Sequence, residues 1–148
     1  MALTRTEHWA TRELQQFLLA RAKTPFAWGS NDCCLFPADA IEAFTGIDIA
    51  DDFRNKYATE ADAWALIKTV TGGATVADAA AWCANKHGLV EWPQPLFAQR
   101  GDLVVIENAG NLIAGIVHLT GRHVVTMAET GIVKFPITRS LIKKAWRV

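Results

Sequence analysis

The spacing of apolar residues changes once along the chain, at Arg100-Gly101-Asp102. Before this point, apolar residues recur at helical spacing; after it, short runs rich in β-branched residues alternate with turn residues. The predicted helices cover 7–22, 59–71 and 75–86, with Thr59 and Thr75 as caps of the last two. A further helix is predicted to begin near Cys33 and to end at Thr45-Gly46. The predicted strands cover 103–106, 112–117, 123–128 and 132–135, with a last one at 145–148.

Short turns join these strands, so the sheet should be antiparallel. Helices that precede strands in this way indicate an α+β fold. We therefore expect one domain over 1–148, with a helical part at 1–99 and an antiparallel sheet part at 100–148.

Composition excludes several classes of function. Among 148 residues, 15 are Lys or Arg and 15 are Asp or Glu, which leaves no basic surface for nucleic acid. No apolar run approaches the ~18 residues of a membrane span, and the N-terminal residues lack an apolar signal core. We expect a protein that is cytoplasmic when synthesised. The three cysteines form neither a disulfide framework nor a zinc-site spacing, so no metal is expected.

The segment 28–36 places a cysteine where a polar turn meets an apolar helix. Free N–H groups and the helix dipole at such a start stabilise a thiolate, which is one setting of nucleophilic cysteines. Helical spacing aligns Cys33 with Phe36, Ala40 and Phe44 on the face expected to pack on the protein. Cys34 is predicted to point to the flank of this helix. The other reading is that such a cysteine serves only as a small buried apolar residue, as predicted for Cys83.

Several motifs together resemble a known family. An aromatic-Trp-Gly-x-x-Asp-Cys-x-x-Phe segment opens a helix, and Arg-Gly-Asp-Leu-Val-Val opens a meander of strands. This combination resembles the NlpC-type branch of the papain-like cysteine peptidases. The resemblance is closer to its phage- or prophage-encoded, tail-associated relatives, through Ala38-Asp39-Ala40, Phe53-Arg54 and Ala145-Trp146.

This resemblance implies a papain-like fold and a peptidase or amidase that cleaves peptidoglycan stem peptides without a cofactor. Cys33 matches the family's nucleophile. Trp28 and Asp32, which flank it in the same segment, are expected to contact the substrate. The partners implied are the peptidoglycan peptide and other phage tail proteins, with incorporation into the virion tail.

The family's catalytic histidine has no counterpart at its usual position. The family places it in a His-x-Gly-Ile pattern at the head of the second strand, where this sequence has Ile113. His118 and His123 are the imidazoles left in the sheet part, so they are the candidate partners of Cys33. A cysteine peptidase needs such a base to activate the thiol and to protonate the leaving amine.

Three readings therefore remain open. The chain is an active cysteine peptidase that uses Cys33 with His123 or His118, or a papain-like scaffold without that chemistry that has a structural or interaction role in tail assembly. The third reading is an unrelated binding domain.

Overall fold

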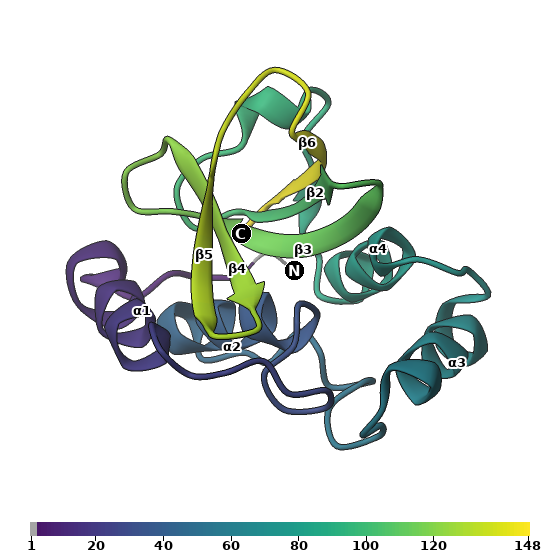
Figure 1. Ribbon diagram of the computed structural model, residues 1–148. Helices are drawn as coiled ribbons and strands as arrows, with labels where there is room; N and C mark the ends of the chain where they lie inside the picture. The colour runs from purple at the N-terminus through teal and green to yellow at the C-terminus, as the bar shows by residue number, and fades with distance from the viewer. Residues whose placement is uncertain (1–2) are drawn as a thin grey trace.

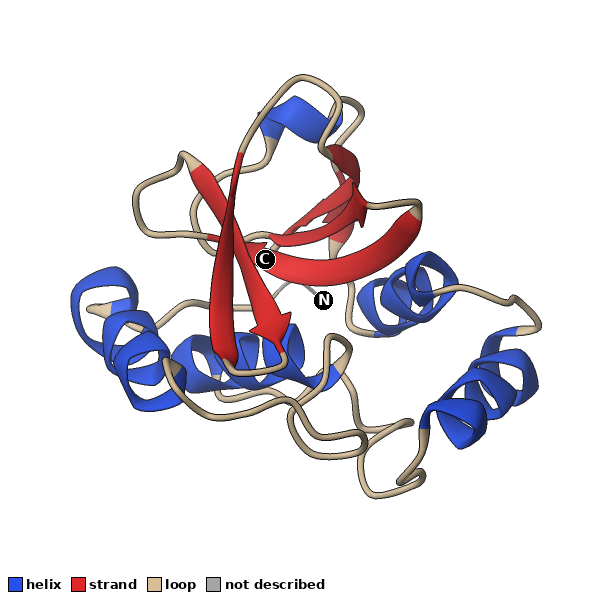
Figure 2. Cartoon of the chain, viewed as in Figure 1, coloured by secondary structure: helices blue, strands red, loops and turns tan. Residues whose placement is uncertain are grey.

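The computed structural model describes residues 3–148, in which helices and strands occupy separate halves (Figure 1, Figure 2). The helical half contains a π-helix at Trp9–Leu14, followed by α1 (Gln15–Arg21), α2 (Leu35–Thr45), α3 (Glu60–Thr71) and α4 (Val76–Lys86). The sheet contains β1 (Val90–Glu91), β2 (Leu103–Asn108), β3 (Asn111–Val117), β4 (His123–Ala128), β5 (Gly131–Pro136) and β6 (Ile142–Arg147). These elements confirm the predicted α+β class.

All pairs in the six-stranded sheet are antiparallel, as predicted, in the order β1-β6-β2-β3-β4-β5. The larger core lies between the helices and the sheet. Phe36, Ala40 and Phe44 of the predicted helix face are fully buried in it, whereas Cys33, predicted on the same face, is only partly buried. A second apolar cluster, which includes Val104 and Val124, lies on the opposite face. β4 and β5 cross the direction of β2 and β3, so the sheet curls around this cluster (Figure 1).

Both predicted caps are confirmed. The hydroxyl oxygens of Thr59 and Thr75 accept hydrogen bonds from Asp62 N and Asp78 N. The Asp78 carboxylate in turn accepts a hydrogen bond from Thr75 N, which completes a capping box.

Two local features differ from the sequence prediction. The first half of the predicted helix at 7–22 is a π-helix, and over so few residues the apolar spacing does not distinguish the two helix types. The connector at 89–100 contains β1 and a 3₁₀ turn at Pro95–Phe97, elements too short to leave a periodic pattern.

Asp102, of the Gly-Asp pair at the start of the sheet, joins distant parts of the chain. Its buried carboxylate accepts hydrogen bonds from Arg5 Nη2 at 3.0 Å, Trp92 Nε1 at 2.8 Å, Gln99 N at 2.8 Å and Val148 N at 3.1 Å. The motif thus has a structural function in this chain. Among the described residues, no helix has the length and apolar character needed to span a bilayer.

Candidate functional site

Asp32 organises the turn that carries the cysteines. Its Oδ1 accepts hydrogen bonds from Cys34 N and Leu35 N, both at 2.9 Å, and its backbone carbonyl accepts from Phe36 N. The Asp32 side chain therefore accepts from N–H groups at the start of α2 as a capping side chain does, while Cys34 holds the N-cap position. The helix begins at Leu35, so Cys33 and Cys34 lie in the turn immediately before it.

The other carboxylate oxygen of Asp32 holds the loop in front of the cysteines. It accepts hydrogen bonds from Gly29 N at 2.9 Å and from the Tyr57 hydroxyl at 2.6 Å. Asp32 has no exposed surface, so the prediction that it contacts substrate is wrong. Burial, followed by the Asp32 hydrogen bond, raises the pKa of Tyr57 above its usual range.

Gly29 is required by the way this loop packs. Its φ is +84°, which side chains rarely adopt, and an added Cβ would lie 2.3 Å from the Tyr57 carbonyl oxygen. The Trp28-Gly29 pair therefore lets the loop lie directly against the segment that contains Tyr57.

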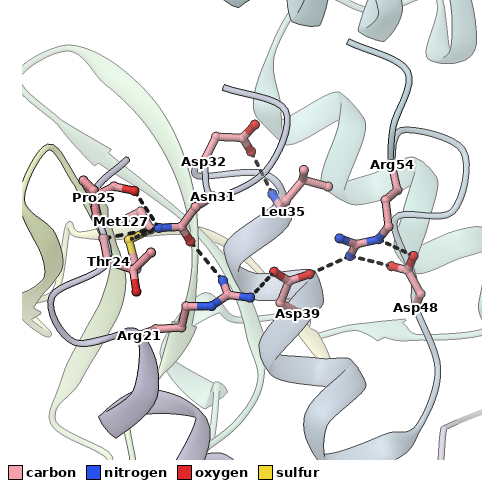
Figure 3. A network of polar contacts seen from close by, with 10 residues as sticks. All are labelled: Arg21, Thr24, Pro25, Asn31, Asp32, Leu35, Asp39, Asp48, Arg54 and Met127. Atoms are coloured by element: carbon pink, nitrogen blue, oxygen red, sulfur yellow. Dashed lines mark hydrogen bonds and ion pairs between the residues drawn. The ribbon is translucent and has the colours of Figure 1, made fainter. Parts of the chain in front are cut away.

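A network of polar contacts fixes the same loop to α1 and α2 (Figure 3). Asn31 is buried; its amide donates to Pro25 O at 3.0 Å, and its Oδ1 accepts from Arg21 Nη1 at 2.9 Å. Arg21 also pairs with Asp39 of α2 at 2.7 Å, and Asp39 pairs with Arg54 at 2.6 Å. These contacts give the turn before α2 a defined position.

The two adjacent cysteines face different environments. Cys33 lines an open groove of about 660 Å³, together with Trp28, Trp64, Leu112, Ile113 and Met127; we call this the Cys33 groove. Trp28, predicted to contact substrate, stacks edge-on against Trp64, with ring centroids 6.0 Å apart.

Cys34 lines a small apolar cavity of about 30 Å³ that also includes Cys83, Phe53 and Leu103. The prediction that Cys34 points to the flank is therefore wrong. The helical-wheel angle that separated it from Cys33 does not apply, because both residues precede the helix.

The environments of Cys34 and Cys83 favour their neutral thiols. The adjacent Cys33 thiol, followed by burial, raises the pKa of Cys34 well above its usual value. Burial raises the pKa of Cys83 to about 12. Neither group is therefore a ready nucleophile near neutral pH.

We expect iodoacetamide at pH 8 to alkylate Cys33 in the native protein before it modifies Cys34 or Cys83. Cys33 lies in the open groove, whereas the other two thiols line the small cavity and have raised pKa values. Peptide mapping after timed alkylation measures the order, and the same reaction in urea should label all three. Equal native labelling of Cys33 and Cys34 would contradict the assignment.

Neither His118 nor His123, the predicted partners of Cys33, lines the Cys33 groove. His118 follows β3 directly and lies five residues beyond Ile113, a distance of about 17 Å along a strand. Its ring faces His123, with centroids 6.3 Å apart, and both Nδ1 atoms contact Thr120 Oγ1 at 3.2 and 3.3 Å. Burial, followed by Lys134 and His123, lowers the pKa of His118.

The head of β3 is the part of the sheet that meets Cys33. Leu112 packs against the core beneath the helices, whereas Ile113 packs against the cluster on the opposite face. Both residues line the Cys33 groove, and Leu112 is the one that packs on the helix side of the sheet. Neither residue can accept a proton from a thiol.

The Cys33 groove thus combines a solvent-accessible thiol with aromatic and apolar walls. Glu60 is the other titratable side chain that lines it, and no imidazole does. Within residues 3–148, no cluster of three or more His, Cys, Asp or Glu side chains is suited to a metal ion. The arrangement can bind an apolar segment, and the thiol shares the groove with one carboxylate, Glu60, and with no imidazole.

Comparison with known proteins gives a family over nearly the whole chain. The family described as "Domain of unknown function (DUF6950)" matches residues 4–148. Neither a curated protein nor a solved structure matches the sequence.

Proposed function

The chain belongs to the family DUF6950, and we propose that it is a papain-like scaffold that binds a peptide segment in the Cys33 groove without cleaving it. The main observation that supports this proposal is that a cysteine and apolar side chains line the groove, whereas no imidazole does. The order of helices before an antiparallel sheet, with Cys33 just before α2, supports the papain-like part of the proposal.

The bound segment belongs to another phage tail protein. This part of the proposal depends on the resemblance of the Cys33 segment to tail-associated relatives. The groove is suited to such a segment, because Trp28, Trp64 and Met127 offer aromatic and thioether surfaces to apolar side chains. The exposed side-chain amide of Asn111, which also lines the groove, is available to the backbone of such a segment.

We expect no product when the purified protein is incubated with peptidoglycan stem peptides and analysed by mass spectrometry. The wild type and Cys33→Ser should behave alike, since no imidazole lines the groove with the thiol. A product made by the wild type and absent with Cys33→Ser would overturn the non-catalytic reading and establish a cysteine amidase instead. That second candidate is favoured by one observation, the open position of Cys33 before α2.

Binding is tested separately by attaching a photo-crosslinker to Cys33. Tail particles assembled with the labelled protein should yield a crosslink to one tail protein, through a segment with apolar residues. Trp64→Ala should reduce this crosslink, whereas Trp82→Ala, which changes an exposed tryptophan outside the groove, should not. Absence of any crosslink in assembled particles would refute the tail-binding role.

A further inference from the structure

Three aromatic rings that pack edge to face line part of the Cys33 groove. The ring centroids of Phe26 and Trp28 are 4.9 Å apart at an interplanar angle of 82°, and those of Trp28 and Trp64 are 6.0 Å apart at 71°. All three residues are only partly buried. The rings therefore form walls at steep angles to one another, with aromatic surface left open to a ligand.

A carboxylate lies beside these rings. Glu60 precedes Trp64 by one turn of α3, and Trp64 Nε1 donates to Glu60 Oε1 at 3.3 Å. Glu60 is the one charged residue among the described residues that line the groove. Within residues 3–148, no lysine, arginine or histidine forms an ion pair with it. We call Glu60 and the three rings the Glu60 subsite.

A second contact between a tryptophan and a carboxylate in this chain shows what the Glu60 subsite lacks. Trp82 Nε1 donates to Asp52 Oδ2 at 2.9 Å, and Lys86 Nζ lies 3.0 Å from the same oxygen. The charge of Asp52 is therefore compensated within the protein. Glu60 has the same kind of indole donor but no cation beside it, so its charge is available to a cation from a partner.

Aromatic rings and a carboxylate in one groove favour the same kind of ligand group. A cation close to the face of a tryptophan ring is attracted by the ring quadrupole, and a carboxylate attracts it as well. Arginine suits this combination better than lysine, because its planar guanidinium stacks on aromatic rings while its N–H groups donate to a carboxylate.

From these observations we infer that the Glu60 subsite binds an arginine side chain of the partner segment. The guanidinium stacks against the rings of Trp28 and Trp64 and donates to the Glu60 carboxylate. Apolar residues of the segment on either side of the arginine contact the remaining apolar walls of the groove. The inference rests on the proposed function of the Cys33 groove and names the residue by which the segment is recognised.

The probe is an acetylated and amidated pentapeptide with a central arginine flanked by leucines, and its control carries citrulline in place of arginine. Citrulline has the shape of arginine without its charge. In the ¹⁵N-labelled protein, the arginine peptide should shift the indole N–H signals of Trp28 and Trp64 and leave that of Trp82 unchanged. The citrulline peptide should bind about tenfold more weakly, because it loses both the cation–π attraction and the ion pair.

Two variants test the role of the carboxylate. Glu60→Gln keeps an oxygen for the Trp64 indole, and it should weaken binding of the arginine peptide about threefold while changing citrulline binding little. Asp52→Asn, which removes the compensated carboxylate beside Trp82, should bind both peptides as the wild type does.

The outcomes separate this inference from the proposed function. Equal binding of the two peptides at the Trp28 and Trp64 signals would overturn the arginine preference and leave a peptide-binding groove. Binding of neither peptide, or shifts confined to Trp82, would overturn the inference, whereas the crosslink in tail particles tests the proposed function independently.

Discussion

Replacing Asp32 by alanine is expected to lower the free energy of unfolding by about 2–4 kcal/mol, because three backbone N–H groups and a buried hydroxyl lose their common acceptor. The carboxylate has no exposed surface and accepts bonds from Gly29 N, Cys34 N, Leu35 N and the Tyr57 hydroxyl. Loss of the helix cap alone costs about 1 kcal/mol. The buried Tyr57 hydroxyl, left without its acceptor, adds about 1–3 kcal/mol.

Urea unfolding monitored by tryptophan fluorescence measures this loss. Ser30→Ala is the matched control, since Ser30 lies in the same loop with an exposed side chain, and its effect should stay within about 0.5 kcal/mol. A loss below about 1 kcal/mol for Asp32→Ala would mean that the four hydrogen bonds are not the main support of the turn.

Local sequence signals were sufficient for most of the secondary structure. The caps at Thr59 and Thr75 depend on residues only three positions away, and the strands follow from alternation within a few residues. The short elements at Val90–Glu91 and Pro95–Phe97 escaped prediction, because their conformations depend on pairing with β6 and on packing near Trp92.

The site was less predictable, because its geometry depends on contacts between distant segments. The sequence identified Cys33 as the cysteine of interest but misplaced Cys34, since the helix begins only at Leu35. The role of Asp32 as a buried cap depends on Tyr57, which lies 25 residues away in the chain. A polar turn residue before a helix could have indicated the cap, although not its burial.

The positions of the two histidines relative to Cys33 could not be predicted for a similar reason. A sequence shows that His118 and His123 lie at one end of a hairpin, but not which end of that hairpin meets α2. In the structure the opposite end, with Leu112 and the turn before β3, meets the Cys33 groove. The separation of thiol and imidazole therefore results from the docking of the sheet on the helices.

If Cys33 reacts slowly because no base lies beside it, then Leu112→His should increase the reactivity of its thiol. We expect iodoacetamide to alkylate Cys33 about tenfold faster at pH 6, because an adjacent imidazole increases the thiolate fraction while the lower basicity reduces part of the gain. Leu96→His is the control: Leu96 is exposed on the 3₁₀ turn and does not line the Cys33 groove, so an imidazole there should leave the rate unchanged. The difference should shrink at pH 9, where an ordinary thiol is already largely ionised. Equal acceleration in both variants would show that the gain does not come from an imidazole placed in the Cys33 groove.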